Sequence, residues 1–184
     1  MKRFPRDRAQ LAFIDLLFIL LLLFVLIINP PTKESAARPM ADFMLFIVWD
    51  AGRNTDLDVY VRGPDRAVAW FRTKDIGYAS IDRDDLGATR DYSTLNQEIV
   101  GFRSPPDGSY LVSLHTYRES APGPGTVLMA LQTRAGQDVW GVEIPLPGPL
   151  VEVGVVEFVF REGAFVRALP SSALIRHAAT GVRP

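Results

Sequence analysis

One carboxylate stands inside the most apolar stretch of this chain. Residues 11–28 read LAFIDLLFILLLLFVLII, and Asp15 is the one polar residue in this stretch. A charged residue inside a membrane helix costs about 2.5–3.5 kcal/mol on insertion scales, so it usually faces a partner or an ion pathway. In a protein-lined, partly hydrated site, such a carboxylate can take up and release a proton. Because one helix cannot enclose a pathway, Asp15 predicts a multi-span membrane partner.

A second set of carboxylates lies in the polar half of the chain. Two groups are visible, namely Asp50, Asp56 and Asp58, and then Asp82, Asp84 and Asp85. Calcium takes six to eight oxygen ligands, which carboxylates at alternate positions can supply. The candidate metal ligands are Asp56, Asp58, Asp82 and Asp84. The alternative is turn chemistry, in which aspartates accept hydrogen bonds from nearby amides and pair with Arg53, Arg83 or Arg90.

Other residues suggest chemistry less strongly. Four aromatic residues are candidates for a sugar-stacking platform or, alternatively, for core packing: Trp49, Trp70, Phe71 and Trp140. Ser113 and His115 share one face of an expected strand, but no nucleophile elbow accompanies them. No phosphate-binding loop is present, so energy would come from an ion gradient rather than from a nucleotide. We therefore expect a protein that is not an enzyme.

The composition narrows the function further. The net charge is −1, from 20 basic and 21 acidic residues, so a nucleic-acid partner is not expected. The chain has no cysteine and two histidines, which argues against a disulfide framework, a zinc–thiolate site or a histidine-rich metal site.

The apolar run predicts a transmembrane helix over residues 11–29, behind a basic tail over residues 1–10. At ~1.5 Å per residue, 18 residues span about 27 Å, close to the ~30 Å hydrocarbon core. Four basic residues precede the run: Lys2, Arg3, Arg6 and Arg8. This excess predicts a cytoplasmic N-terminus and an exported C-terminal part. Two alternatives are a cleaved signal peptide, with Ser35-Ala36-Ala37 at the cleavage site, and a helix that begins after Asp15 as its N-cap.

The remaining chain predicts an all-β antiparallel sandwich over residues 42–170. Residues 30–41 form a polar linker with room for a short plug, and the tail over 171–184 has a short helix expected at 171–179. Runs rich in Val, Ile, Phe, Tyr and Trp alternate with Gly/Pro/Asp turns. The expected strands cover residues 43–49, 57–62, 67–72, 97–102, 110–117, 126–133, 138–144, 151–160 and 164–169. A one-residue slip of the period-two pattern at Gly154-Val155 predicts a β-bulge.

The membrane segment resembles a known family. Phe13-Ile14-Asp15-Leu16-Leu17, followed by an unbroken Leu/Ile/Phe run, is similar to the single transmembrane helix of ExbD/TolR proteins. MotB-type stator subunits share the layout of a basic tail, one helix with an aspartate near its cytoplasmic start, and a periplasmic domain. The resemblance covers about residues 1–31. It implies a bacterial inner-membrane, single-pass protein whose Asp15 carries the coupling ion.

The resemblance also implies partners. In that family two copies of this subunit sit inside a pentamer of a MotA/ExbB/TolQ-like multi-span protein, and ion flow drives rotation. Phe18, Ile19 and Leu22 lie on the face of Asp15 by helical spacing, so they would pack against the pore or the second copy. The expected ion is a proton. Sodium requires several oxygen ligands, and Asp15 is the single polar side chain of the apolar run over residues 11–28.

The exported part departs from that family, since neither its small α/β domain nor an OmpA-like domain is visible. Instead, several short motifs resemble YfaP-like and pre-peptidase C-terminal β-sandwich modules. These motifs are Asp56-Leu57-Asp58-Val59-Tyr60-Val61, Gly63-Pro64-Asp65, Leu86-Gly87 and Pro105-Pro106-Asp107-Gly108-Ser109-Tyr110. Modules of this type accompany many functions, so the resemblance implies a fold rather than an activity.

These features predict a B-type subunit of a proton-driven motor or force transducer, whose sandwich couples to an unknown periplasmic or outer-membrane target. One alternative is a passively membrane-anchored glycan- or calcium-binding module. Another is a sensor or assembly factor of a secretion complex, in which Asp15 pairs with a basic residue of a partner. No cofactor is expected beyond the coupling proton and, in the sandwich, calcium.

Overall fold

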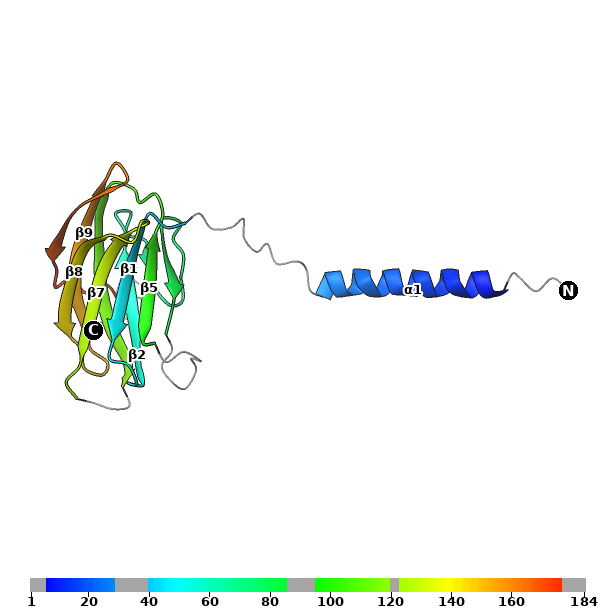
Figure 1. Ribbon diagram of the computed structural model, residues 1–184, viewed down its shortest axis with the longest axis horizontal. Helices are drawn as coiled ribbons and strands as arrows, with labels where there is room; N and C mark the ends of the chain where they lie inside the picture. Colours follow the sequence, from blue (N-terminus) through cyan, green and yellow to red (C-terminus); the bar gives the residue numbers. More distant parts are fainter. Residues whose placement is uncertain (1–5, 29–39, 86–94, 120–122, 177–184) are drawn as a thin grey trace. The chain divides into compact units, whose positions relative to one another are not determined.

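The computed structural model describes residues 6–28, 40–85, 95–119 and 123–176, and within the helix it describes the side chains of residues 13–24. The chain divides into two compact units, Met1–Pro39 and Met40–Pro184. Among the described residues, the first unit contains one helix and the second contains ten strands (Figure 1). Each unit is described by itself below.

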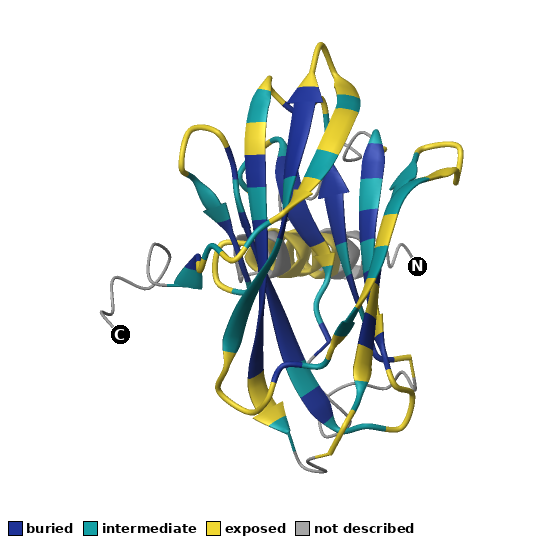
Figure 2. Cartoon of the chain, turned by 90° about the vertical axis from the view of Figure 1, so that its left-hand side faces the viewer, coloured by how far each residue is buried: buried dark blue, intermediate teal, exposed yellow. Residues whose placement is uncertain are grey.

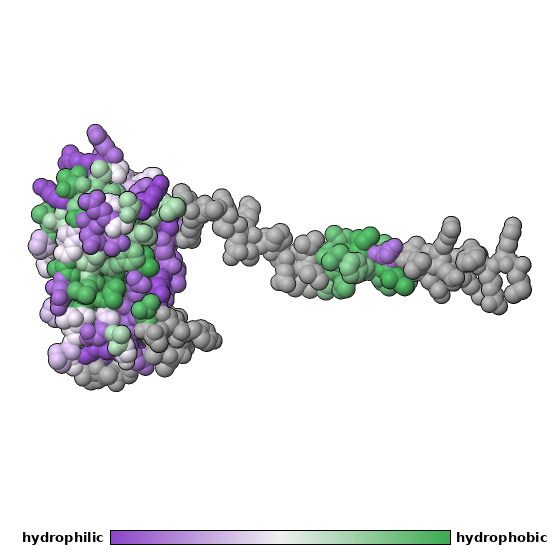
Figure 3. Space-filling view, viewed as in Figure 1, coloured by the Kyte–Doolittle hydropathy of each residue, from purple (hydrophilic) through white to green (hydrophobic). Residues whose placement is uncertain are grey.

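The helix α1 runs over Arg6–Ile28. Leucine and alanine favour it, and it ends before Asn29-Pro30, because a proline disfavours the helical conformation of the residue before it. Figure 3 shows its described side chains as an apolar surface interrupted by one hydrophilic patch. Counting only the described residues, no helix has both the length and the apolar character that a membrane span requires.

The second unit is an antiparallel β-sandwich of two five-stranded sheets, which confirms the predicted fold of this part. One sheet has the order β4-β5-β1-β7-β8, and the other has the order β10-β9-β6-β2-β3. The first sheet is built from β1 (Phe43–Trp49), β4 (Ala79–Arg83), β5 (Gln97–Phe102), β7 (Thr126–Thr133) and β8 (Asp138–Pro145). The second is built from β2 (Thr55–Arg62), β3 (Val68–Ala69), β6 (Gly108–Glu119), β9 (Glu152–Arg161) and β10 (Ala164–Pro170).

The core lies between the inner faces of the two sheets and follows the period-two pattern of the strands. Leu45 and Ile47 of β1 face Val112 and Leu114 of β6, and all four side chains are fully buried. Aromatic rings fill one part of this layer, where Phe102 and Tyr110 lie edge to face at 5.8 Å. Figure 2 shows buried residues concentrated along the strands and exposed residues at the loops.

Three sequence predictions need correction. The expected strand over 67–72 shortens to β3, because Trp70 turns away in a bridge with Thr73. The strand β4 was not predicted, although Ala79, Ser80 and Ile81 are buried in it. Residues 171–175, the first part of the expected helix over 171–179, are not helical, whereas Arg176, the last described residue, is helical. They form an extended cover on the outer face of β9, and residues 177–184 lie outside the described part.

The predicted β-bulge is confirmed. Along β6, Val112 pairs with Val156 and Ser113 pairs with Gly154, so Val155 is the extra residue. Beyond the bulge, Val156, Phe158 and Phe160 all point into the core.

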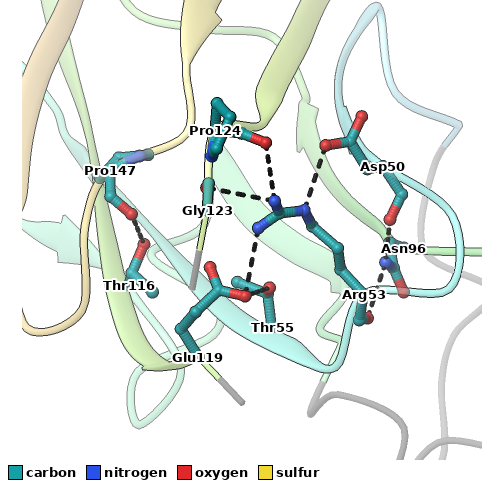
Figure 4. A network of polar contacts seen from close by, with 9 residues as sticks. All are labelled: Asp50, Arg53, Thr55, Asn96, Thr116, Glu119, Gly123, Pro124 and Pro147. Atoms are coloured by element: carbon teal, nitrogen blue, oxygen red, sulfur yellow. Dashed lines mark hydrogen bonds and ion pairs between the residues drawn. The ribbon is translucent and has the colours of Figure 1, made fainter. Parts of the chain in front are cut away.

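At one end of the sandwich, Arg53 ties several loops together (Figure 4). Its guanidinium donates to Pro124 O at 2.7 Å and pairs with Glu119 Oε1 at 3.3 Å and Asp50 Oδ2 at 3.2 Å. Asn96 Nδ2 donates to Arg53 O at 2.9 Å in the same network. Asp50 therefore pairs with Arg53 and stabilises these loops, as the turn alternative predicts.

Candidate functional site

Asp15 lies well inside α1, nine residues after its first residue, Arg6. The N-cap interpretation is therefore wrong, because the helix begins more than two turns earlier. The side chains near Asp15 are apolar and exposed in the single chain, including Phe18 at 58%, Ile19 at 54% and Leu22 at 48%. Their role as a packing face for a partner stays a prediction, because every large apolar side chain described in α1 is similarly exposed.

In the sandwich, the fold assembles a group of three carboxylates. Asp58 comes from β2, Asp84 follows β4, and Glu98 comes from β5 of the opposite sheet. One carboxylate oxygen from each lies within 4.8 Å of the other two. We call these three residues the carboxylate cluster. Two of its members, Asp58 and Asp84, were predicted as metal ligands.

An open strand edge brings the cluster together. The strand β3 covers β2 only at Val61 and Arg62, so the backbone of Val59 has no strand partner on that side. Glu98 fills this position, and its Oε2 accepts a hydrogen bond from Val59 N at 2.9 Å. An acid side chain from one sheet thereby terminates the open edge of the other sheet.

The cluster is largely removed from solvent. Glu98 is 1% exposed and the side chains of Asp58 and Asp84 are each 8% exposed. Lys74 Nζ lies 2.9 Å from Asp84 Oδ2, but half of the Lys74 side chain is exposed. Burial is the main cause that raises the pKa of Asp58 to about 7, and the charges of Asp56 and Asp84 add to it. Burial likewise raises the pKa of Glu98 well above its usual range. Three ionised carboxylates at this spacing repel one another unless a cation or protons compensate them.

His115 flanks the cluster on β6, directly opposite Asp58 in the strand register. Its Nε2 lies 2.9 Å from Arg176 Nη1. A guanidinium only donates, so Nε2 accepts and the ring proton is on Nδ1. Nδ1 is buried without a hydrogen-bond partner among the described residues, and it lies 3.6 Å from Asp58 Oδ2. Burial, with the charge of Arg176, lowers the pKa of His115, and burial raises the pKa of Asp58, so the charged form of each group is disfavoured.

A pocket of about 260 Å³ opens beside the cluster. Its lining residues are Asp58, Tyr60, Trp70, Phe71, Arg72, His115, Tyr117 and Arg176. Trp70 and Phe71 contact each other edge to face at 4.7 Å. The structure does not bring the four aromatic candidates together, because Trp49 is in the core and Trp140 packs against Phe158 at 5.0 Å.

The other two predicted ligands lie outside the cluster. Asp82 binds Arg103 Nη2 at 2.7 Å and accepts a hydrogen bond from Ser80 Oγ at 2.6 Å, so it serves an ion pair. Asp56 acts on Asp58 and Glu98 through its charge. Glu98 was missed by the sequence analysis. The sequence does contain a sign of its role. Glu98 is an acid at every-second-residue spacing from Val100 and Phe102, whose side chains point into the core, so its own side chain points inward as well.

Ser113 and His115 do not form a nucleophile–base pair. Ser113 Oγ donates to Glu152 Oε1 at 2.6 Å. The same oxygen accepts Ile175 N at 2.6 Å and Arg176 N at 3.0 Å. Glu152 thereby holds the C-terminal segment over Tyr60 and Trp70, where Ile175 is fully buried.

We expect Glu152→Ala to release this segment. The N–H groups of the buried Ile175 and the half-buried Arg176 would lose their acceptor, and an unsatisfied buried donor costs about 1–3 kcal/mol. The free energy of unfolding should fall by about 2 kcal/mol, and the amides of Ile175 and Arg176 should exchange with solvent much faster. Hydrogen exchange followed by mass spectrometry measures this. Glu157→Ala on the same strand is the control, and equal exchange of the segment in both variants would show that Glu152 is not the clamp.

Stability should depend on pH through Asp58. Because folding raises the pKa of this acid from 3.8 to about 7, its contribution is fully present below pH 3.8 and is lost as the pH rises through 7. The difference, 7 − 3.8, corresponds to at most about 4 kcal/mol at ~1.36 kcal/mol per pH unit. In chelator-treated protein, urea unfolding at pH 5 and pH 8 should show a smaller loss of stability for Asp58→Asn than for wild type. Parallel pH profiles of the two proteins would contradict this assignment.

No family model matches this chain, and no curated protein matches it. In structure it is similar to the crystal structure of the unknown-function protein SAV2460, with a TM-score of 0.49 and 16% sequence identity. The similarity covers 80% of this chain and 100% of that chain.

Proposed function

We propose that the protein is a B-type subunit of a proton-driven inner-membrane motor or force transducer. In this proposal Asp15 carries the proton, and the sandwich passes force to a target in the cell envelope. The observation that supports it most is the position of Asp15, a carboxylate inside a helix whose other side chains over residues 13–24 are all apolar. Neither capping nor a contact within the described chain accounts for an acid at this position.

The proposal requires that α1 crosses the membrane. Support comes from the sequence, where the apolar run extends beyond residues 13–24 in both directions and spans residues 11–28. Basic residues precede the run, which favours a cytoplasmic N-terminus and a periplasmic sandwich. This orientation sets Asp15 near the cytoplasmic side of the span and the sandwich in the periplasm.

The proposal also requires partners. A lone helix with an acid on its surface is unfavourable in lipid, and a second copy and a pentameric multi-span subunit of the MotA/ExbB/TolQ type would cover Asp15. Each proton that crosses a membrane potential of ~100 mV releases about 2.3 kcal/mol. Repeated proton transfers at Asp15 would supply the work that the sandwich delivers.

Native mass spectrometry after mild-detergent purification from the native membrane tests this proposal. We expect a complex with two copies of this chain and five copies of a multi-span protein. If the chain emerges alone, or with only a soluble ligand, Asp15 has no pathway and the protein is a passively anchored binding module.

Replacement of the helix is a second experiment that distinguishes a motor subunit from a passively anchored binding module. A neutral helix of equal length, with the basic tail retained, should remove the partner and the function if Asp15 works as proposed. Full function with a neutral helix would show that α1 is only an anchor.

A further inference from the structure

We propose that the carboxylate cluster of Asp58, Asp84 and Glu98 binds one calcium ion. This site lies in the sandwich and does not depend on the function proposed for α1. Its donors are all carboxylate oxygens, which suit a hard cation such as calcium or magnesium rather than zinc or copper.

The number of carboxylates favours calcium. Magnesium usually keeps several waters and binds only one or two carboxylates, whereas calcium accepts more oxygen ligands in a flexible geometry. Calcium–oxygen distances are about 2.3–2.6 Å, so two ligands of one ion are separated by at most about 5 Å. The three oxygens of the cluster lie within 4.8 Å of one another, which is inside this limit.

A second observation points to an ion, and it comes from the hydrogen bonds around the cluster. Asp58 is 6% exposed, and its carboxylate lies beside the His115 ring. His115 is 1% exposed, and its unpartnered Nδ1–H faces the same carboxylate from 3.6 Å. Carboxylates that bind metal ions usually have one oxygen on the metal and a hydrogen bond from a neighbouring donor. The 3.6 Å between Nδ1 of His115 and Oδ2 of Asp58 is too long for a hydrogen bond, but His115 is placed to supply this donor when Asp58 binds an ion.

The excess of negative charge around the carboxylate cluster also favours a bound cation. Within the described part of the chain, Lys74 is the basic group in direct contact with the cluster, and it reaches only Asp84. Arg176 acts on Asp58 from a greater distance, and it contacts His115. Asp56 adds negative charge near Asp58 and Glu98. A divalent cation would compensate the charges of Asp58 and Glu98, whose ionised forms burial disfavours.

The site would join the two sheets and would have access to solvent. Asp58 belongs to one sheet, whereas Glu98 and Asp84 belong to the other sheet and the end of its edge strand. Asp58 also lines the pocket of about 260 Å³. Three carboxylates provide at most six oxygens, so water or a ligand hydroxyl that enters through this pocket can complete the coordination.

Calcium titration of the full-length protein in detergent micelles tests the site. We expect one calcium ion per chain by equilibrium dialysis with radioactive calcium after chelator treatment. At a hundredfold excess over the Kd, the melting temperature should rise by about 5–10 °C. Magnesium at the same concentration should give a clearly smaller rise. No bound calcium at 1 mM would overturn the proposal.

Variants locate the ion. Asp58→Asn and Asp84→Asn should each weaken calcium binding at least tenfold. Asp82→Asn is the matched control, because Asp82 lies two residues from Asp84 but binds Arg103, and its calcium affinity should stay within twofold of wild type. Circular dichroism checks that each variant is folded. If Asp58→Asn does not fold, Asp84→Asn decides. An equal loss in Asp82→Asn and Asp84→Asn would show that the ion does not bind in the cluster.

Discussion

Replacement of Asp15 by asparagine should abolish proton flux and leave folding and assembly intact. Asparagine has nearly the same shape as aspartate and remains polar, but it cannot take up or release a proton. The proposed complex with a multi-span partner is reconstituted in liposomes that contain a pH-sensitive dye. When a potential is applied, the interior of these liposomes should acidify. With Asp15→Asn, the rate should fall at least tenfold, to the level of empty liposomes.

Two controls make this result specific. Asp7→Asn is the same change in the first turn of the same helix, and it should keep wild-type flux. Asp15→Glu retains a titratable carboxyl and should keep a part of the flux. Wild-type flux in Asp15→Asn would rule out Asp15 as the ion carrier. Loss of the multi-span partner from this variant would instead assign the residue to assembly, as expected for a secretion-complex factor.

Substitution of Gly154 should strongly destabilise the sandwich. A Cβ at this position would lie 2.4 Å from the carbonyl carbon of Ser172 and 2.5 Å from the amide nitrogen of Ala173. Both obstacles are backbone atoms, so a rotamer change cannot relieve the overlap. Gly154→Ala should therefore displace the C-terminal segment and lower the free energy of unfolding by about 3 kcal/mol.

Urea unfolding followed by tryptophan fluorescence measures this loss, because Trp70 lies under the displaced segment. Gly141→Ala is the matched control. Gly141 is also a strand glycine, but its nearest obstacle is Met129 O at an ordinary contact distance of 3.4 Å. The control should change stability by less than about 1 kcal/mol. If the two variants unfold at the same urea concentration, the segment does not pack as the structure describes.

The strand pattern was readable from the sequence because core burial repeats along it. Val156, Phe158 and Phe160 occupy every second position and all belong to the core, so both their strand and its bulge were predicted. The strand β4 carries no such alternation, because Ala79, Ser80 and Ile81 are all buried. Period-two reasoning cannot identify a strand that is covered on both faces.

The carboxylate cluster was predictable only in part. Asp58 and Asp84 were identified from local acidic groups, but Glu98 has no other acid in its strand. Its contact with Val59 crosses from one sheet to the other and depends on the short length of β3. That length follows from Trp70 turning away, which is a tertiary event rather than a local preference.

The position of β1 has a mechanical consequence. A load that reaches Met40 along the chain enters the sandwich through β1, which is hydrogen-bonded along its length to both β5 and β7. Antiparallel hydrogen bonds lie perpendicular to the strands, so a pull along β1 shears all of them together instead of peeling them one by one. Both ladders must therefore rupture at once before the sandwich yields, which makes β1 a strong point of attachment for a domain under tension.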